Sequence, residues 1–263
     1  MKSAAQYLYE LFNLENKVAV VIGGGGVLAG AVAKAYARAG AKVAILDLKQ
    51  EYAEQRAREI HEEGGTAMAI AVDATSRRDL EEADRRIAET WGRVDILVNA
   101  PGINSATPFF EITEEEWHKI LDVNLKSMFL ACQIFGKRMI EQGEGGSIIN
   151  FSSASSGPPL SKVFTYSISK AGVNNLTQWL AREWAPYRIR VNAIAPGFFP
   201  AEQNRRILTE ERIADIMRHT PMKRFGEPEE LVGAMLWLAS ERASGFVTGH
   251  IVRVDGGFTA MTI

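Results

Sequence analysis

The sequence lacks three things: cysteine pairs, long apolar runs and an excess of charge of either sign. Its 263 residues include a single cysteine, Cys132, which excludes an internal disulfide and a metal site built from several cysteines. The 30 basic and 32 acidic side chains leave a net charge of −2, whereas a nucleic-acid surface normally needs a clustered positive field. No segment reaches the roughly 20 uninterrupted apolar residues of a membrane span. These absences predict that neither nucleic acid nor a membrane is a partner.

The amino terminus, MKSAAQYLYELFNLENK, carries acidic residues and no long apolar core, unlike a secretory signal peptide. A cytoplasmic protein is therefore expected. The composition, 46% hydrophobic and 24% charged, is that of an ordinary globular chain, and the length suits one sizeable domain or two small ones. Cys132 falls in a helix-like apolar run, where a small core residue is the expected role.

Short runs rich in valine and isoleucine recur and are typical of strands buried on both faces, as in a parallel sheet. The expected strands are 17–22, 42–46, 67–72, 94–99, 147–152, 188–194 and 250–254. Helical patterns alternate with them: one ends at Gly40, one runs from the cap candidate Ser76 to Gly92, a long one starts near Thr113, and one opens with Pro228. The alternation predicts an α/β fold, a single-domain, Rossmann-type, doubly wound parallel sheet of about seven strands over residues 1–263, with helices on both faces.

Four consecutive glycines follow the first expected strand and precede a helix. A turn there would aim backbone N–H groups and a helix N-terminus at a phosphate, and glycine permits close approach of the backbone. The register is ambiguous. Gly24, Gly26 and Ala29 satisfy G-x-G-x-x-A, whereas G-x-x-x-G-x-G anchored at Gly23 finds Val27 and Ala29 in place of its later glycines. Alone, the glycines fit both a dinucleotide cradle and a flexible turn.

Asp47 ends the second expected strand, 24 residues after Gly23. A carboxylate at that position can accept hydrogen bonds from the ribose diol of a dinucleotide, and it would repel a 2′-phosphate. No arginine lies in the glycine turn, although Lys49 follows Asp47 closely. We therefore expect NAD(H) as the preferred cofactor, with NADP(H) as the alternative.

The segment SIINFSSASSGPPLSKVFTYSISK holds a candidate catalytic group. Tyr166 and Lys170 are four residues apart in a helical pattern and share one face, and Ser153 lies 13 residues before Tyr166 at a strand end. A phenol with a pKa of ~10 is ionised only about one part in a thousand at pH 7. Two nearby positive charges, the Lys170 ammonium and an oxidised nicotinamide, would lower that pKa. A serine hydroxyl would hold the substrate oxygen in line.

This joint pattern resembles the short-chain dehydrogenase/reductase family over nearly the whole chain. The resemblance implies an active site of Asn124, Ser153, Tyr166 and Lys170, in which Asn124 holds a proton-relay water and Tyr166 exchanges the substrate proton. It also implies a nicotinamide cofactor. The expected cofactor contacts are Gly23, Gly24, Gly25, Gly26, Val27, Leu28, Asp47, Asp73, Ala74, Asn99, Ala100, Pro101, Gly102, Tyr166, Lys170, Pro196, Gly197 and Phe199.

Two departures from the family pattern affect the expected cofactor cleft. Ala100 and Pro101 stand in NAPG where the family has N-N-A-G, which alters one wall of the cleft and removes a backbone donor. Val27 and Ala29 stand where glycines are usual. We interpret both as changes in cradle geometry. A cofactor-sensing protein on the same fold is the non-enzymatic alternative, and the retained tyrosine and lysine argue against it.

The segment near 198–226 is expected to choose the substrate, because it has the pattern of a loop followed by a helix and predicts a mobile lid. Its polar string AEQNRR offers groups for hydroxyls and a carboxylate, although an exposed charged helix start explains it equally well. The candidate substrate contacts are Asn104, Ser155, Gln203, Asn204 and Arg205.

The strings VIGGGGVLAGA, RVNAIAPGFF and VDGGF are similar to the D-mannonate oxidoreductase (fructuronate reductase) branch of the family, which implies reversible oxidation of a secondary alcohol in a sugar acid. A gluconate-type polyol dehydrogenase and a 3-oxoacyl reductase are the alternatives. The acyl-carrier partner of the latter would need a basic patch, for which the candidates are Arg205, Arg206, Arg218, Lys223 and Arg224.

The remaining residues give weaker indications. The four histidines are scattered without ligand spacing, so no metal site is predicted. The family resemblance implies a homotetramer. Trp179, Leu180, Trp184 and the apolar carboxyl terminus are candidate contacts for it, with plain core as their alternative role.

Overall fold

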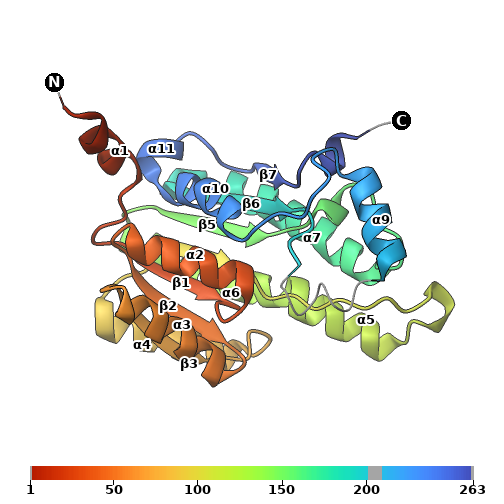
Figure 1. Cartoon of the computed structure of the whole chain (residues 1–263). Coiled ribbons are helices and arrows are strands. Elements are labelled where there is room, and N and C mark those ends of the chain that lie inside the picture. The colour runs from red at the N-terminus through yellow and green to blue at the C-terminus, as the bar shows by residue number, and fades with distance from the viewer. Residues whose placement is uncertain (1, 201–208, 262–263) are drawn as a thin grey trace.

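The computed structural model describes residues 2–200 and 209–261, and its centre is one seven-stranded sheet (Figure 1). The strands are β1 Val18–Ile22, β2 Lys42–Asp47, β3 Thr66–Ala71, β4 Ile96–Asn99, β5 Gly146–Phe151, β6 Ile189–Pro196 and β7 Ile251–Val254. All pair in parallel, in the order β3-β2-β1-β4-β5-β6-β7. The strand order reverses between β1 and β4, so the predicted doubly wound α/β fold is confirmed, and each expected strand is present.

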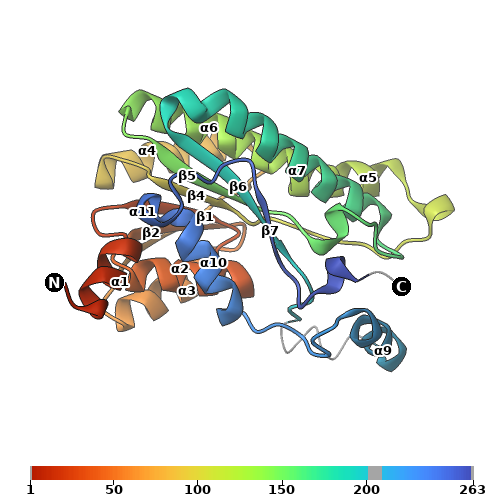
Figure 2. The same ribbon diagram turned by 90° about the horizontal axis from the view of Figure 1, so that it is seen from above.

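Alternate residues of each strand enter two separate cores. In β1, Val18, Val20 and Ile22 face one core, and Ala19 and Val21 face the other. The first core is covered by α4 Arg77–Trp91, α6 Ser127–Gln142 and α7 Phe164–Trp184, and the second by α2 Val27–Arg38, α3 Gln50–Glu62 and α10 Glu229–Ala239 (Figure 2). Burial on both faces explains why the strands are almost continuously apolar.

Capping residues set several helix ends where the sequence indicated them. The Ser76 hydroxyl accepts a hydrogen bond from the Asp79 N–H at the start of α4, and Gly92 ends this helix in the left-handed conformation, with φ of 77°. Gly40, with φ of 96°, follows α2. Pro228 is the N-cap of α10, one residue before the helix, so the expectation that it occupies the first turn is off by one position.

The long helix expected from Thr113 is interrupted. Thr113 caps α5 (Glu114–Leu121), and a π-helical turn, Asp122–Lys126, separates α5 from α6. A π turn adds a residue to one turn of the helix and is frequent at functional sites. It carries Asn124, which is fully buried.

Three further helices complete the described part of the chain. Helix α9 (Glu210–His219) is the helix expected within 198–226, whereas the sequence analysis singled out neither α1 (Ala4–Phe12) nor α11 (Glu241–Ser244). Helices α1 and α11 lie side by side (Figure 1), and the Ser240 hydroxyl joins them by donating to the Leu11 carbonyl at 2.6 Å. Among residues 2–200 and 209–261, no helix is both long and apolar enough to cross a membrane.

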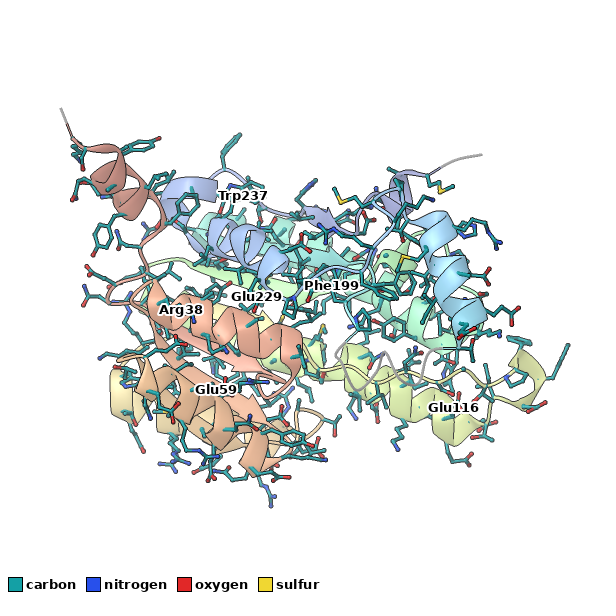
Figure 3. The ribbon with its side chains drawn as sticks, viewed as in Figure 1. Arg38, Glu59, Glu116, Phe199, Glu229 and Trp237 are labelled. Carbon is teal, nitrogen blue, oxygen red and sulfur yellow. The ribbon has the colours of Figure 1, made fainter. Side chains whose placement is uncertain are left out.

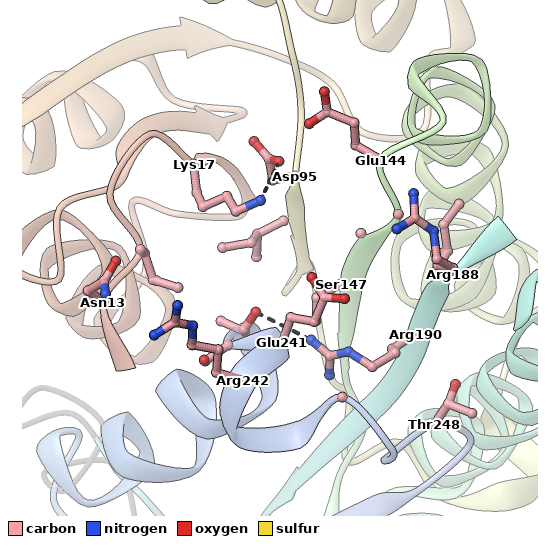
Figure 4. A pocket seen from close by; sticks show the side chains of 18 of the residues that line it. Asn13, Lys17, Asp95, Glu144, Ser147, Arg188, Arg190, Glu241, Arg242 and Thr248 are labelled. Atoms are coloured by element: carbon pink, nitrogen blue, oxygen red, sulfur yellow. Dashed lines mark hydrogen bonds and ion pairs between the residues drawn. The ribbon is translucent and has the colours of Figure 1, made fainter. Parts of the chain in front are cut away.

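The amino edge of the sheet contains a cavity of about 740 Å³ with walls of mixed charge (Figure 4). Asp95 lies at its back, 5% exposed, and accepts hydrogen bonds from the Val18 N–H at 2.9 Å, Arg93 Nε at 2.8 Å and Lys17 Nζ at 3.2 Å. Burial alone would raise the pKa of Asp95, but these donors and charges outweigh it and hold the pKa below its usual value. The carboxylate therefore ties β1 to β4.

Replacing Asp95 by alanine should destabilise the protein by about 3 kcal/mol, because it leaves the Val18 N–H and the facing cations without their buried acceptor. Glu144 offers a matched control, since it pairs with the same Arg93 at 2.6 Å but has a 60% exposed side chain. Glu144→Ala should cost less than about 1 kcal/mol. Urea unfolding measures both; equal losses would contradict the burial argument. Because the folded pKa is depressed, the Asp95 contribution is present above the ordinary pKa of 3.8 and is lost as pH falls below it.

Candidate active site

The carboxyl ends of the parallel strands lie at one edge of the sheet (Figure 1). There β1 runs into the glycine turn, β4 into the 100–103 turn, β5 into Ser153 and β6 into Gly197. Helix α7 passes this edge and carries Tyr166 and Lys170 in its first two turns. The fold thus brings together candidate groups from five separate segments.

Gly23 requires glycine for two reasons. It is left-handed, with φ of 73°, and its N–H donates to the Leu46 carbonyl at 2.7 Å, which folds the turn towards β2. An added Cβ would lie 3.1 Å from backbone atoms of Ala100 and Pro101. The glycine turn and the NAPG turn therefore pack directly against each other, backbone to backbone.

The helix that follows the glycine turn begins with an open N-terminus. Gly26 is its N-cap and provides no side-chain cap, so the first N–H groups of α2, at Val27 and Leu28, have no partner within the helix. Val27 is 42% exposed, whereas Ala29 is buried in the core. Uncapped N–H groups at the positive end of a helix fit a pyrophosphate. Neither departure from glycine blocks this approach, because one side chain is exposed and the other packs inward.

Asp47 fastens the glycine turn to β2. Its Oδ2 accepts from the Gly25 N–H at 3.0 Å and its Oδ1 from the Lys49 N–H at 3.1 Å, and each oxygen retains capacity for a further donor such as a ribose hydroxyl. Sequence reasoning missed Tyr52: an added Cβ on Gly25 would lie 2.6 Å from the Tyr52 Cβ. Lys49 Nζ lies 4.7 Å from the centre of the Tyr52 ring. The only feature of the sequence that could have placed Tyr52 beside the glycine turn is its position in the first turn of the helix after Asp47.

Other expected cofactor contacts lie on the same edge. Asp73 and Ala74 follow β3, and Asp73 Oδ1 accepts from the Thr75 N–H at 2.8 Å. Gly102 lies between two candidate groups, since an added Cβ there would be 3.7 Å from Lys170 Nζ and 3.8 Å from Asn124 Oδ1. These candidate positions lie along one row of strand ends.

Asn99 was expected to contact the cofactor, and the structure corrects this. The residue has no exposed surface, and its side-chain amide donates to Asn150 Oδ1 at 2.8 Å and to Cys132 Sγ at 3.4 Å. Asn150 in turn donates to Thr177 Oγ1 at 2.9 Å. Asn99 therefore joins β4 and β5 to the helices beneath the cleft. Burial also raises the pKa of the Cys132 thiol to about 12, and the expected core role of Cys132 is confirmed.

Lys170 is buried close to Tyr166. Its Nζ donates to the Phe151 carbonyl at 2.7 Å and lies 5.6 Å from the centre of the Tyr166 ring. Desolvation lowers the pKa of Lys170 to about 7. Burial raises the pKa of Tyr166, and a hydrogen bond with Ser153 opposes that rise. Burial thus opposes the charged form of Lys170 as well as that of Tyr166, so within the chain alone the expected lowering of the Tyr166 pKa is not present.

Ser153 follows β5 and caps a short 3-10 turn, Ala154–Ser156. Its Oγ accepts from both the N–H and the hydroxyl of Ser155, each at 3.1 Å. A hydroxyl has two acceptor lone pairs and one hydrogen to donate, so the Ser153 hydrogen is left for a partner in the cleft. Ser155 was expected to contact substrate. It is 1% exposed and faces Ser153, so it orients Ser153 instead.

Asn124 is fastened to the surrounding protein through its side-chain amide. Its Nδ2 donates to the Ile103 carbonyl at 2.9 Å and to Ser169 Oγ at 3.0 Å, and its Oδ1 accepts from the Ile103 N–H at 2.8 Å. Both N–H groups of the amide are thus engaged with the protein. Asn124 therefore joins the turn after β4 to α7, and its expected contact with a proton-relay water stays a prediction.

The two ends of the segment 198–226 lie next to each other. The Gly226 N–H donates to the Phe198 carbonyl at 2.9 Å, and an added Cβ on Gly226 would lie 2.3 Å from the Phe199 ring. Phe199 packs against the α10 side of the core near this junction (Figure 3). Pro196 is buried at the end of β6, and the Gly197 N–H continues the sheet by donating to the Val254 carbonyl at 2.9 Å.

The substrate side is partly outside the described residues, since Gln203, Asn204, Arg205 and Arg206 fall there. Asn104 is exposed, and its Oδ1 accepts from the Ser105 N–H at 2.8 Å. In the described part of the chain, no three His, Cys, Asp or Glu side chains gather so as to hold a metal ion.

Of the basic residues expected to form an acyl-carrier patch, the three that the structure describes have local partners. Arg218 pairs with Asp215 at 2.6 Å, and Arg224 pairs with Glu230 at 2.6 Å. Lys223 Nζ donates to the last carbonyls of α9, which it reaches at 3.1 Å. The charges of the two arginines are therefore compensated within the chain, which weakens the case for an acidic carrier protein as partner.

Comparison with known proteins supports this geometry. Residues 26–259 match a family model, adh_short_C2, described as Enoyl-(Acyl carrier protein) reductase. The chain is 43% identical to a Bacillus subtilis (strain 168) protein named Uncharacterized oxidoreductase UxuB, over 94% of this chain and 96% of that protein.

Solved structures share the fold of this chain. A putative D-mannonate oxidoreductase from Haemophilus influenza with bound NAD has a TM-score of 0.91 at 37% identity, covering 97% of this chain and 99% of its own. A gluconate 5-dehydrogenase from Burkholderia cenocepacia J2315 in complex with NADP and tartrate has a TM-score of 0.92 at 33% identity, covering 97% and 100%. The chain belongs to the short-chain dehydrogenase/reductase family and is one of its NAD(P)-dependent oxidoreductases acting on CH–OH groups.

Proposed function

We propose that this enzyme interconverts a secondary alcohol and a ketone on a sugar acid with NAD(H), with D-mannonate and D-fructuronate as the favoured pair. The observation that carries the proposal is the meeting of Ser153, Tyr166 and Lys170 beside an open helix N-terminus. The two structural relatives named for D-mannonate and gluconate support a sugar-acid substrate. A related polyol is the alternative substrate.

The proposed mechanism assigns one task to each side chain. Bound NAD+ would accept a hydride from the carbinol carbon. Tyr166, as phenolate, takes the hydroxyl proton of the substrate, and Ser153 donates a hydrogen bond to the same oxygen. Lys170 binds the nicotinamide ribose and, when protonated, stabilises the phenolate. In the direction of reduction, the Tyr166 hydroxyl returns its proton to the carbonyl oxygen.

The NAD preference rests on Asp47. Its carboxylate is fixed by the Gly25 and Lys49 N–H groups and would repel a 2′-phosphate placed beside it. Lys49, the nearby cation, interacts with the Tyr52 ring and hydroxyl. The relatives include both an NAD complex and an NADP complex, so the strength of this preference has to come from kinetics.

Two larger-scale features complete the proposal. Residues 198–226 act as a substrate lid, which is supported by the hydrogen bond from the Gly226 N–H to the Phe198 carbonyl that brings the two ends of this segment together. The enzyme assembles as a homotetramer, which is supported by three exposed apolar side chains, Phe164, Ile168 and Trp179, spaced along one face of α7.

The first test measures the rate of formation of reduced cofactor from its absorbance at 340 nm, with NAD+ and then NADP+. The substrates are D-mannonate, D-gluconate and neutral polyols. Turnover of D-mannonate with NAD+ supports the proposal as stated. Turnover of neutral polyols alone would move the substrate class to polyols. If no substrate of either class reacts while NADH still binds, 3-oxoacyl substrates come next, and the sugar-acid proposal is abandoned.

Tyr166→Phe should lower kcat by about 1000-fold, because it removes the group that exchanges the substrate proton. NADH binding should persist, since the glycine turn and Lys170 are untouched. Tyr187→Phe is the control, because Tyr187 is 49% exposed on a short turn outside the site. Steady-state rates and NADH fluorescence titration measure the two effects. Near-normal turnover of the Tyr166 variant would rule out the mechanism.

Lys170→Met should abolish turnover but stabilise the cofactor-free protein at pH 7 by up to about 4 kcal/mol, because burial lowers the lysine pKa from 10.5 to about 7. The depressed pKa means that the native state binds fewer protons than the unfolded state between those values. The stability of the wild type therefore rises with pH across that window, and the advantage of the variant shrinks. Urea unfolding at pH 7 and 9 tests this, with the exposed Lys119→Met as control. An advantage that grew with pH would contradict it.

Asp47→Ala should raise the NADP+/NAD+ ratio of kcat/KM by about 10- to 100-fold, because it removes a charge-assisted acceptor for the ribose and a repulsive charge for the 2′-phosphate. Glu51→Ala controls for the general loss of one negative charge, since Glu51 is exposed in the first turn of α3. If both variants shift the ratio equally, the effect of Asp47 is long-range and no ribose contact is needed to explain it.

A further inference from the structure

Ser153 and Tyr166 stand on different elements, and their separation has to be fixed for the proposed chemistry. Ser153 belongs to the turn after β5, and Tyr166 belongs to α7. The Ser155 hydrogen bonds set the direction of the Ser153 hydroxyl inside its own turn. They do not hold that turn against α7, so some other group has to do so.

Asn174 lies one turn beyond Lys170 on α7, and the spacing of Tyr166, Lys170 and Asn174 puts them on one helix face. Its side chain is half-buried and reaches the Ser153 turn from that face. The sequence analysis gave it no role, because an asparagine in the middle of a helix is unremarkable by itself.

Asn174 holds the turn on both sides of Ser153. Its Oδ1 accepts from the Ser152 hydroxyl at 2.6 Å, and its Nδ2 donates to Ser156 Oγ at 2.9 Å. The Ser156 hydroxyl donates to the Ser153 carbonyl at 2.6 Å, so a chain of hydrogen bonds connects Asn174 to Ser153 through Ser156. The Ser152 N–H donates to the Ile194 carbonyl of β6 at 2.8 Å, so the same link is anchored in the sheet.

We propose that Asn174 is a positioning residue that fixes the Ser153 hydroxyl against Tyr166 during catalysis. The inference rests on the proposed roles of those two residues. A misplacement on the order of 1 Å can cost about 100-fold in rate, so a link that sets this separation is a direct determinant of kcat. The hydrogen bond from Ser153 also opposes the rise in the Tyr166 pKa, so loosening the turn should make the phenol harder to ionise.

Asn174→Ala should lower kcat by about 10- to 100-fold, with little change in the KM of the alcohol or in the dissociation constant of NADH. The limb of the profile over which kcat for alcohol oxidation rises with pH, set by ionisation of Tyr166, should move up by about one pH unit. Asn174→Asp keeps the acceptor for Ser152 and loses the donor to Ser156, so its kcat should fall between that of the wild type and that of Asn174→Ala. Asn175→Ala is the matched control: it is the next residue, of the same type, and exposed.

A second readout does not depend on knowing the substrate. Ultraviolet titration of the NAD+ complex, with the Tyr166→Phe spectrum subtracted, reports the ionisation of Tyr166. An upward shift of about one unit in Asn174→Ala, absent in Asn175→Ala, supports the inference even if every sugar acid fails as a substrate. An unchanged titration and an unchanged kcat would overturn it while leaving the proposed function intact. Should Asn174→Ala fail to fold, Ser156→Ala removes the last link of the same path and is judged by the same two measurements.

Discussion

The carboxyl edge of this protein is organised around one buried amine. The hydrogen bond from Lys170 to the Phe151 carbonyl joins α7 to the end of β5, and both the glycine side and the serine side of the site are placed relative to that joint. The same burial favours the neutral forms of Lys170 and Tyr166, lowering one pKa and raising the other. Without a cofactor, the protein therefore disfavours the charged forms of both Lys170 and Tyr166. A bound cation beside the pair, such as an oxidised nicotinamide, would shift that balance and couple proton transfer to cofactor binding.

Much of the architecture could be predicted from the sequence, because the fold obeys constraints that are visible along the chain. Strands buried on both faces have to be apolar throughout, and this pattern located all seven strands. Residues that cap helices, such as Ser76 and Gly92, come from a small set of residue types, so helix ends can be predicted from them. The rule that parallel strands present ligand sites at their carboxyl ends then placed Ser153 and Tyr166 at one edge.

The roles of individual polar side chains could not be predicted in the same way. Motif positions predicted ligand contacts for three polar residues, Asn99, Asn124 and Ser155. Each of them is buried, and its side chain forms hydrogen bonds with other groups of the protein. Spacing along a strand or helix determines which face a residue occupies. It does not determine which of several polar partners a rotatable side chain will choose. The π turn that carries Asn124 was missed for a related reason, because one extra residue in a helical turn leaves no periodic signal.

The closed junction at Phe198 and Gly226 has an evolutionary consequence. A segment whose two ends already touch can be lengthened, shortened or replaced while the sheet beneath it keeps its hydrogen bonds and register. The length of the segment between Phe198 and Gly226 can therefore change without moving the strand ends on either side of it. Under the proposed lid role, changes confined to this segment would alter what the enzyme oxidises while the sheet stays in place.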